Sequence, residues 1–218
     1  MATPNPSRPK SDGARTKLLE AGLSVIRRQG YSATGVDELC AAAGVTKGAF
    51  FHHFPTKEAF AVAAADHWSE TTSAMFADAD YHRLADPLDR VRGYVDLRAA
   101  LLEGPLEEIT CLVGTMVQEA FATSDAIRAA CDASISGHAR RLEADIAQAM
   151  ALYGASGFTP ASLALHTQVV LQGGFILAKA KGDLAVARDS VAHLKRYITS
   201  LFNNPQTEEF QLCGSSFL

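Results

Sequence analysis

The hydrophobic positions between residues 34 and 60 follow a helical period that a glycine and a proline interrupt. One buried face is predicted by four residues at the spacing i, i+3, i+4 and i+7, which are Val36, Leu39, Cys40 and Ala43. Gly44 ends this helix, because a glycine adopts the left-handed backbone of a helix end at little cost. Phe50 and Phe54 predict a second short helix from Lys47 to about Phe54, which ends at Pro55. A third helix is predicted to begin near residue 56.

Two short helices joined by a tight turn predict a helix-turn-helix, whose second helix enters the major groove of DNA. The hydroxyls of Thr34 and Thr46 can cap the two helices, and Thr34 is also placed for a phosphate contact. On the outward face of the second helix, Lys47 can donate to guanine or phosphate and Ala49 can touch a thymine methyl. His52 and His53 can donate to phosphates or base edges. Gly48 lets the helix backbone approach DNA.

The remaining periodic segments are also helical, so the sequence predicts an all-α protein. Long helices are predicted over residues 56–80, 86–103, 106–122, 124–153, 160–181 and 184–202. The predicted organisation is a mobile arm (1–12), a helix-turn-helix DNA-binding domain (13–57), a second helical domain (58–203) and a tail (204–218). The helix that begins near residue 56 would connect the DNA-binding domain to the second domain.

The distribution of charge supports a DNA-binding end. The formal net charge of the 218 residues is −4, which alone argues against a nucleic-acid partner. Residues 1–57, however, hold eight lysines and arginines and four acids, and the rest of the chain holds 12 basic and 20 acidic residues. A basic amino-terminal region followed by an acidic remainder is typical of a protein that binds DNA at one end.

The sequence offers no chemistry of the kind that an enzyme or a metal site needs. The four cysteines have no metal-ligand spacing, and no signal peptide is apparent, which favours reduced thiols in the cytoplasm. No catalytic or phosphate-binding motif is present, so neither enzyme activity nor a cofactor is expected. No apolar run approaches the length of a membrane span. A helical enzyme and a pure protein-interaction module remain the alternatives, and the second of these would not need the charge split.

Two stretches of sequence resemble TetR-type transcriptional regulators. The run T-K-G-A-F-F-H-H-F-P-T-K-E-A-F is similar to their recognition helix and linker, and G-Y-S-A-T-G-V-D-E-L-C-A-A-A-G-V matches the preceding segment. Phe51 stands where the family usually has Tyr, and it lacks the hydroxyl that would contact a phosphate. The residues expected at DNA are Thr34, Thr46, Lys47, Gly48, Ala49, Phe51, His52, His53 and Lys57.

The two last helices, about 160–181 and 184–202, are apolar enough to pair with those of a second copy as a four-helix bundle. The resemblance implies the same homodimer interface, a repressor role on palindromic double-stranded DNA, and an internal pocket for a small hydrophobic or electrophilic effector. The candidate pocket residues are Trp68, Met75, Cys111, Met116, Phe121, His138, His166 and Phe175. The alternative is that each of these is an ordinary core residue.

Cys111 suggests a second mode of response. The run T-C-L-V-G-T-M-V-Q-E loosely resembles a Gly-Cys-Leu segment of the electrophile-responsive NemR-type branch, with Thr110 in place of the glycine. Lys179 resembles a lysine of that branch, and an ammonium group beside a thiol favours its reactive thiolate form. The alternative is a buried cysteine that acts as a small hydrophobe.

Overall fold

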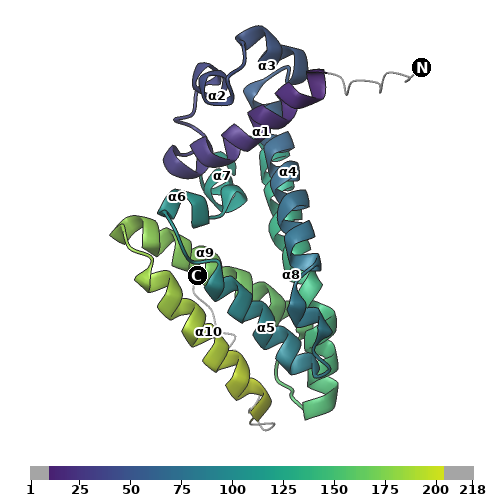
Figure 1. Cartoon of the computed structure of the whole chain (residues 1–218). Helices are drawn as coiled ribbons and strands as arrows, with labels where there is room; N and C mark the ends of the chain where they lie inside the picture. Colours follow the sequence, from purple (N-terminus) through teal and green to yellow (C-terminus); the bar gives the residue numbers. More distant parts are fainter. Residues whose placement is uncertain (1–9, 204–218) are drawn as a thin grey trace, which may run out of the picture. The chain divides into compact units, whose positions relative to one another are not determined.

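The computed structural model describes residues 10–203, and the predicted tail and most of the predicted arm lie outside them (Figure 1). The described residues form helices joined by short turns and contain no strand, which agrees with the predicted all-α class. Within the described residues, the chain divides into two compact units: residues 10–77 with 104–135, and residues 78–103 with 136–203. The predicted domain boundary at residue 57 falls inside the first unit, and an independent domain over 58–203 stays a prediction.

The first unit is built around α1 (Lys10–Gln29), which packs against five other helices. These are α2 (Val36–Ala43), α3 (Lys47–His53), α4 (Lys57–Ala77), α6 (Leu106–Ile109) and α7 (Leu112–Ala120). The start of α8 (Asp125–Tyr153) belongs to the same unit. The hydrophobic core of the first unit contains side chains from all these helices except α6. Among them are Leu18, Ile26, Leu39, Phe50, Phe60, Leu112, Met116 and Ile127.

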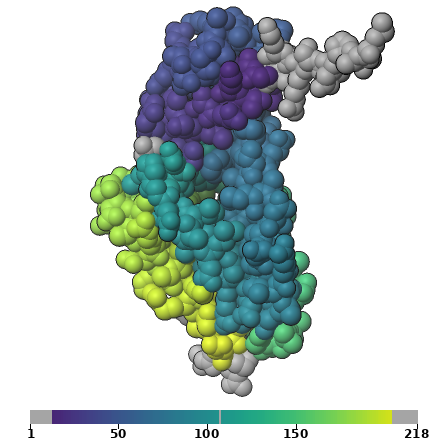
Figure 2. Space-filling view, viewed as in Figure 1, coloured from purple at the N-terminus to yellow at the C-terminus, as the bar shows by residue number. Residues whose placement is uncertain are grey.

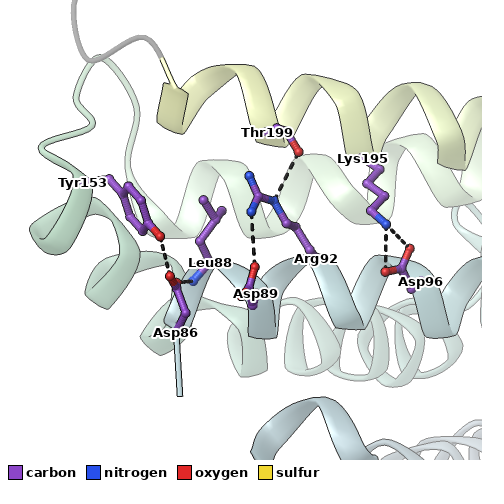
Figure 3. A network of polar contacts seen from close by, with 8 residues as sticks. All are labelled: Asp86, Leu88, Asp89, Arg92, Asp96, Tyr153, Lys195 and Thr199. Atoms are coloured by element: carbon purple, nitrogen blue, oxygen red, sulfur yellow. Dashed lines mark hydrogen bonds and ion pairs between the residues drawn. The ribbon is translucent and has the colours of Figure 1, made fainter. Parts of the chain in front are cut away.

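The second unit contains η1 (Asp80–Arg83), α5 (Pro87–Ala100), the remainder of α8, α9 (Pro160–Lys181) and α10 (Ala185–Asn203). Helix α10 packs against both α9 and α5, as Figure 1 shows. Polar contacts reinforce the apolar contact between α5 and α10 (Figure 3). Arg92 of α5 donates to the hydroxyl of Thr199 at 3.3 Å, and Lys195 of α10 donates to Asp96 at 2.6 Å.

Several helix ends carry side-chain or glycine caps. Asp86 accepts from the backbone N–H of Leu88 at 2.7 Å, and its other oxygen accepts from the Tyr153 hydroxyl. Thr159 and Ser162 form a reciprocal capping box at the start of α9. Gly182 ends α9 with a left-handed φ of +66°, so α9 and α10 are joined by a short turn as expected.

The structure corrects one predicted helix. Residues 106–122 form two helices, α6 and α7, because Thr110 and Cys111 take extended backbone conformations between them. Thr110 is buried, and its hydroxyl has no hydrogen-bond partner within residues 10–203. The apolar periodicity continues across the break, so the sequence pattern does not reveal it.

A second correction concerns α9. Within the described part of the chain, Pro160–Lys181 is long and apolar enough to cross a membrane by length and composition alone, contrary to the expectation from sequence. A core helix can pass the same test. Thr167 and Gln168 are buried, Gln168 donates to the Tyr94 hydroxyl of α5, and α9 packs against α10, which is the environment of a helix in a bundle.

Candidate nucleic-acid interface

The turn between α2 and α3 has the backbone geometry of a helix-turn-helix. Gly44 has a φ of +64°, and its N–H donates to the carbonyl of Ala41 at 3.2 Å. The N–H of Val45 donates to the carbonyl of Cys40 at 3.0 Å, which completes a Schellman end for α2. The turn then passes directly into the cap of α3.

Helix α3 is fixed by its cap and by an aromatic cluster. The Thr46 hydroxyl accepts from the N–H of Ala49 at 3.1 Å, so the predicted cap is confirmed. Phe50 and Phe54 are buried, and each ring lies against Phe60 of α4, with centroids 5.5 and 5.1 Å apart. Because these rings face inward, the opposite face of α3 is turned to solvent.

The outward face of α3 brings most of the predicted DNA contacts together. Lys47, Gly48 and His52 are exposed, and Ala49 and His53 are half-buried. The rings of His52 and His53 meet edge to face at 4.9 Å. Phe51 is 48% exposed, which is unusual for a phenylalanine, and its ring meets that of Phe50 edge to face with centroids 5.3 Å apart. Figure 2 shows the surface of α2 and α3 in blue at the top of the view.

Lys47 is paired with an acidic residue of the neighbouring helix. Its ammonium lies 2.9 Å from a carboxylate oxygen of Asp37, and both side chains are exposed. Exposed ion pairs of this kind contribute about 0–1 kcal/mol. A phosphate can therefore displace Asp37 at small cost.

Thr34 is not placed as the sequence predicts. It is 1% exposed, and its hydroxyl donates to the carbonyl of Gly30 at 2.6 Å. Gly35, not Thr34, is the N-cap of α2, and no side chain caps that end. Thr34 therefore stabilises the turn before α2 from inside and does not face DNA. A threonine one residue before the cap can bond backward to the helix that has just ended, and the pattern does not separate the two uses.

Lys57 also bonds within the protein. Its ammonium donates to the carbonyl of Ser32 at 3.3 Å and lies 4.4 Å over the ring of Tyr31. The Thr56 hydroxyl accepts from the N–H of Ala59 at 3.0 Å and caps α4. The side chain of Lys57 is half-buried, and a phosphate contact from it stays a prediction.

The candidate pocket residues are divided between the two units. Trp68, Met75, Cys111, Met116 and Phe121 belong to the first unit, and His138, His166 and Phe175 belong to the second. Met116 is fully buried in the core, whereas Met75 and Phe121 are among the exposed large hydrophobic residues. His166 is exposed and packs edge to face on Tyr197 at 5.4 Å. A pocket lined by all eight stays a prediction.

A polar cluster inside the second unit was missed by sequence reasoning. The buried hydroxyl of Tyr94 accepts from Nε of Arg98 at 2.9 Å and from the amide of Gln168 at 3.0 Å. It lies 3.1 Å from Nε2 of His138. Desolvation by burial, with the nearby charges of Arg98 and Arg141, lowers the pKa of His138 to about 3. The sequence signal is Gln168, a polar residue inside an otherwise apolar run.

Cys111 occupies a distinctive position. It is the N-cap of α7, and its sulfur accepts from the N–H of Gly114 at 3.4 Å. The Arg27 guanidinium is near enough to interact electrostatically with Cys111, and it lies 5.2 Å from the Trp68 ring. Lys179 is exposed on α9, in the other unit, so its proposed pairing with Cys111 stays a prediction.

The predicted dimerisation helices carry uncovered apolar side chains. Val169 of α9 is 61% exposed, and Leu165, Ile176 and Leu177 of the same helix are also largely exposed. On α10, Tyr197 is exposed and packs beside His166. These residues are the apolar face of α9 and α10.

Comparison with known proteins identifies both parts of the chain. Residues 18–64 match the family model of bacterial regulatory proteins, tetR family. Residues 87–193 match the model of the C-terminal domain of LmrA/YxaF-like transcriptional regulators.

Among curated proteins, the chain is 33% identical over 122 residues to the transcriptional regulator AcuR of Cereibacter sphaeroides, which covers 56% of each protein. It is 34% identical over 118 residues to the HTH-type transcriptional repressor DhaR of Mycobacterium sp., which covers 52% of this chain and 56% of DhaR. The chain thus spans a little over half the length of these relatives. The repressor NemR of Escherichia coli is 43% identical over 49 residues, 22% of this chain and 25% of NemR.

Among solved structures, regulatory protein TetR from Rhodobacter sphaeroides aligns with a TM-score of 0.74 at 28% identity, over 87% of this chain and 98% of that chain. Reduced NemR of E. coli aligns with a TM-score of 0.73 at 22% identity, over 84% and 95% of the two chains, and this shows the shared fold. The curated relatives are named as transcriptional regulators or repressors, which confirms the expectation that the chain is not an enzyme. With a TetR-type amino-terminal region and an LmrA/YxaF-like C-terminal region, the chain belongs to the TetR family of bacterial transcriptional regulators.

Proposed function

We propose that this regulator is a repressor that binds a palindromic duplex as a homodimer, through α3, and is released by a small hydrophobic or electrophilic effector. The observation that carries the proposal is the outward face of α3. A lysine, two histidines, an exposed phenylalanine and a glycine lie there on a helix whose inner face is locked by aromatic packing. These groups can donate to phosphates and base edges and can touch thymine methyls.

Dimerisation is part of the proposal because a single helix-turn-helix domain makes few base contacts. The apolar face of α9 and α10 supplies a surface that a second copy can cover. Two helix-turn-helix domains related by a two-fold axis would bind half-sites about 34–36 Å apart, which is one turn of DNA. The repressor role is supported by the printed names of the relatives DhaR and NemR. Such a protein would act in the cytoplasm, where the chromosome lies.

Release is proposed to follow from a change between two states. A ligand that fits only one state would shift the position of α4, which begins directly after the helix-turn-helix. To convert a 1:99 mixture into 99:1, the ligand must favour that state by about 5.5 kcal/mol. The effector pocket would use some of the eight candidate residues named above.

The proposed function is tested by selecting bound duplexes from a random pool with the purified protein. The expected result is a two-fold symmetric sequence with half-sites one helical turn apart. Addition of small hydrophobic compounds and electrophiles to the selected complex should then identify a compound that releases the DNA. Enrichment of no duplex would contradict the proposal and would favour a protein-interaction module.

A thiol switch is the second candidate mechanism within the same family. It is favoured by the position of the Cys111 sulfur, which caps the amino-terminal end of α7 and lies near Arg27. Treatment with N-ethylmaleimide should release the parent from its duplex and leave Cys111→Ser bound. Cys40, which lies buried in α2, provides a matched control as Cys40→Ser. Equal release of the parent and Cys111→Ser would exclude the switch.

A further inference from the structure

A carboxylate of α7 is bound by the turn that leads into the helix-turn-helix. Glu119 lies in the last turn of α7, and its Oε2 accepts from the backbone N–H of Ser32 at 2.6 Å. Its Oε1 is so close to Gly30 that a Cβ at this position would lie 2.2 Å away. Gly30 also has a φ of +93°, which a residue with a side chain rarely adopts. The turn is therefore shaped around this carboxylate.

A lysine at the start of α4 holds the same turn from another direction. Lys57 donates to the carbonyl of Ser32 and covers the Tyr31 ring. Burial lowers the pKa of Lys57, and the negative charge of Glu119 acts in the opposite sense and raises it. The two charges attract each other across the turn. We call Gly30, Tyr31, Ser32, Lys57 and Glu119 the turn joint.

The turn joint holds both ends of the helix-turn-helix. Its residues 30–32 lie in the turn between α1 and α2, and Lys57 is the first residue of α4, after the turn that follows α3. Glu119 lies outside the region 18–64 that matches the amino-terminal family model. A second hydrogen bond, from the Ser124 hydroxyl to Glu58, joins the start of α8 to the start of α4.

We propose that Glu119 is a positioning residue for DNA binding, which acts by fixing both ends of the helix-turn-helix before DNA arrives. The inference rests on the proposed function and deepens it. A helix-turn-helix with loose ends would lose conformational freedom on binding, and this cost weakens the complex. Helix α7 begins after Cys111 and ends one residue past Glu119. A displacement of α7 by an effector or by a modified thiol would therefore reach the helix-turn-helix through this side chain.

The test compares Glu119→Ala with Glu70→Ala, which removes the same charge from an exposed position on α4. Fluorescence anisotropy measures the affinity of each variant for the duplex selected by the parent. Glu119→Ala should bind on the order of 2- to 30-fold more weakly than Glu70→Ala, the range found for coupled positions. Glu119→Gln should keep most of the parent's affinity, because an amide oxygen can still accept from Ser32.

A double-mutant cycle that combines Glu119→Ala with Lys57→Met tests whether Glu119 has only a structural role. The quantity measured in the cycle is DNA affinity, not melting temperature. If both residues act on one turn, Lys57→Met should lose less affinity in the Glu119→Ala background than in the parent. Additive losses, or equal affinities of Glu119→Ala and Glu70→Ala, would overturn the inference while the parent still binds DNA. Failure of the parent to bind any duplex would instead refute the proposed function.

Discussion

The pKa of His138 is set by the groups that surround it in the folded protein. Burial, and then the charges of Arg98 and Arg141, hold its pKa at about 3, whereas the pKa of a histidine in an unfolded chain is about 6.5. Below about pH 6.5 the unfolded chain takes up a proton that the folded chain does not take up until about pH 3. The free energy of unfolding therefore falls as the pH is lowered through this window.

The pH dependence can be measured by urea unfolding at pH 7 and pH 5. The linkage relation gives a loss of about 2 kcal/mol in the parent from His138 over this interval. His138→Gln cannot take up this proton and should lose about 2 kcal/mol less than the parent over the same interval. An equal loss in parent and variant would show that His138 is already protonated in the folded protein at pH 5.

At the scale of elements, α9 and α10 depend on close backbone packing. A Cβ on Gly174 would lie 3.4 Å from the Cα of Ala187, so α10 approaches α9 at this glycine. Gly137 of α8 is also helical, but a Cβ there would meet only the end of the Arg140 side chain at 3.6 Å. The two glycines should therefore respond oppositely to larger residues.

Thermal or urea unfolding should separate these two positions. Gly174→Val should lower the free energy of unfolding by about 1–3 kcal/mol, because a branched side chain forces α9 and α10 apart. Gly137→Ala should raise it by up to about 1 kcal/mol, the gain in helix propensity. If Gly174→Val had the same free energy of unfolding as the parent, the two helices would adjust without loss and their contact would not be tight.

The elements themselves were largely predictable from sequence, because caps, glycine ends and apolar periods act locally. Thr46 and Gly44 lie where the pattern places them, and α9 begins at Pro160 as predicted. The break at Thr110 and the inward turn of Thr34 were not predictable, since both depend on contacts made after the chain folds. Glu119 was missed for the same reason: its partner Ser32 lies 87 residues away in sequence.

The whole molecule is proposed to act as a dimer that forms through the apolar face of α9 and α10. Val169→Glu places a charge in the centre of this face, and burying an unpaired charge is costly. The variant should sediment as a monomer in analytical ultracentrifugation. It should also lose affinity for the full palindrome, with a much smaller loss for one half-site. Ala133→Glu, at an exposed position of α8, should remain dimeric.

If α3 binds duplex DNA through its exposed face, the affinity must depend on salt, because each phosphate contact releases counterions. For the parent, the affinity for the selected duplex should fall steeply as salt rises, because each phosphate contact contributes about 0.9 to the slope of log K against log salt. Lys47→Met should reduce the magnitude of this slope by about 0.9 for each helix-turn-helix domain of the dimer. Asp37→Asn, which removes the carboxylate paired with Lys47, should bind DNA at least as tightly as the parent. An affinity independent of salt, or an unchanged slope in Lys47→Met, would show that α3 does not bind DNA phosphates through Lys47.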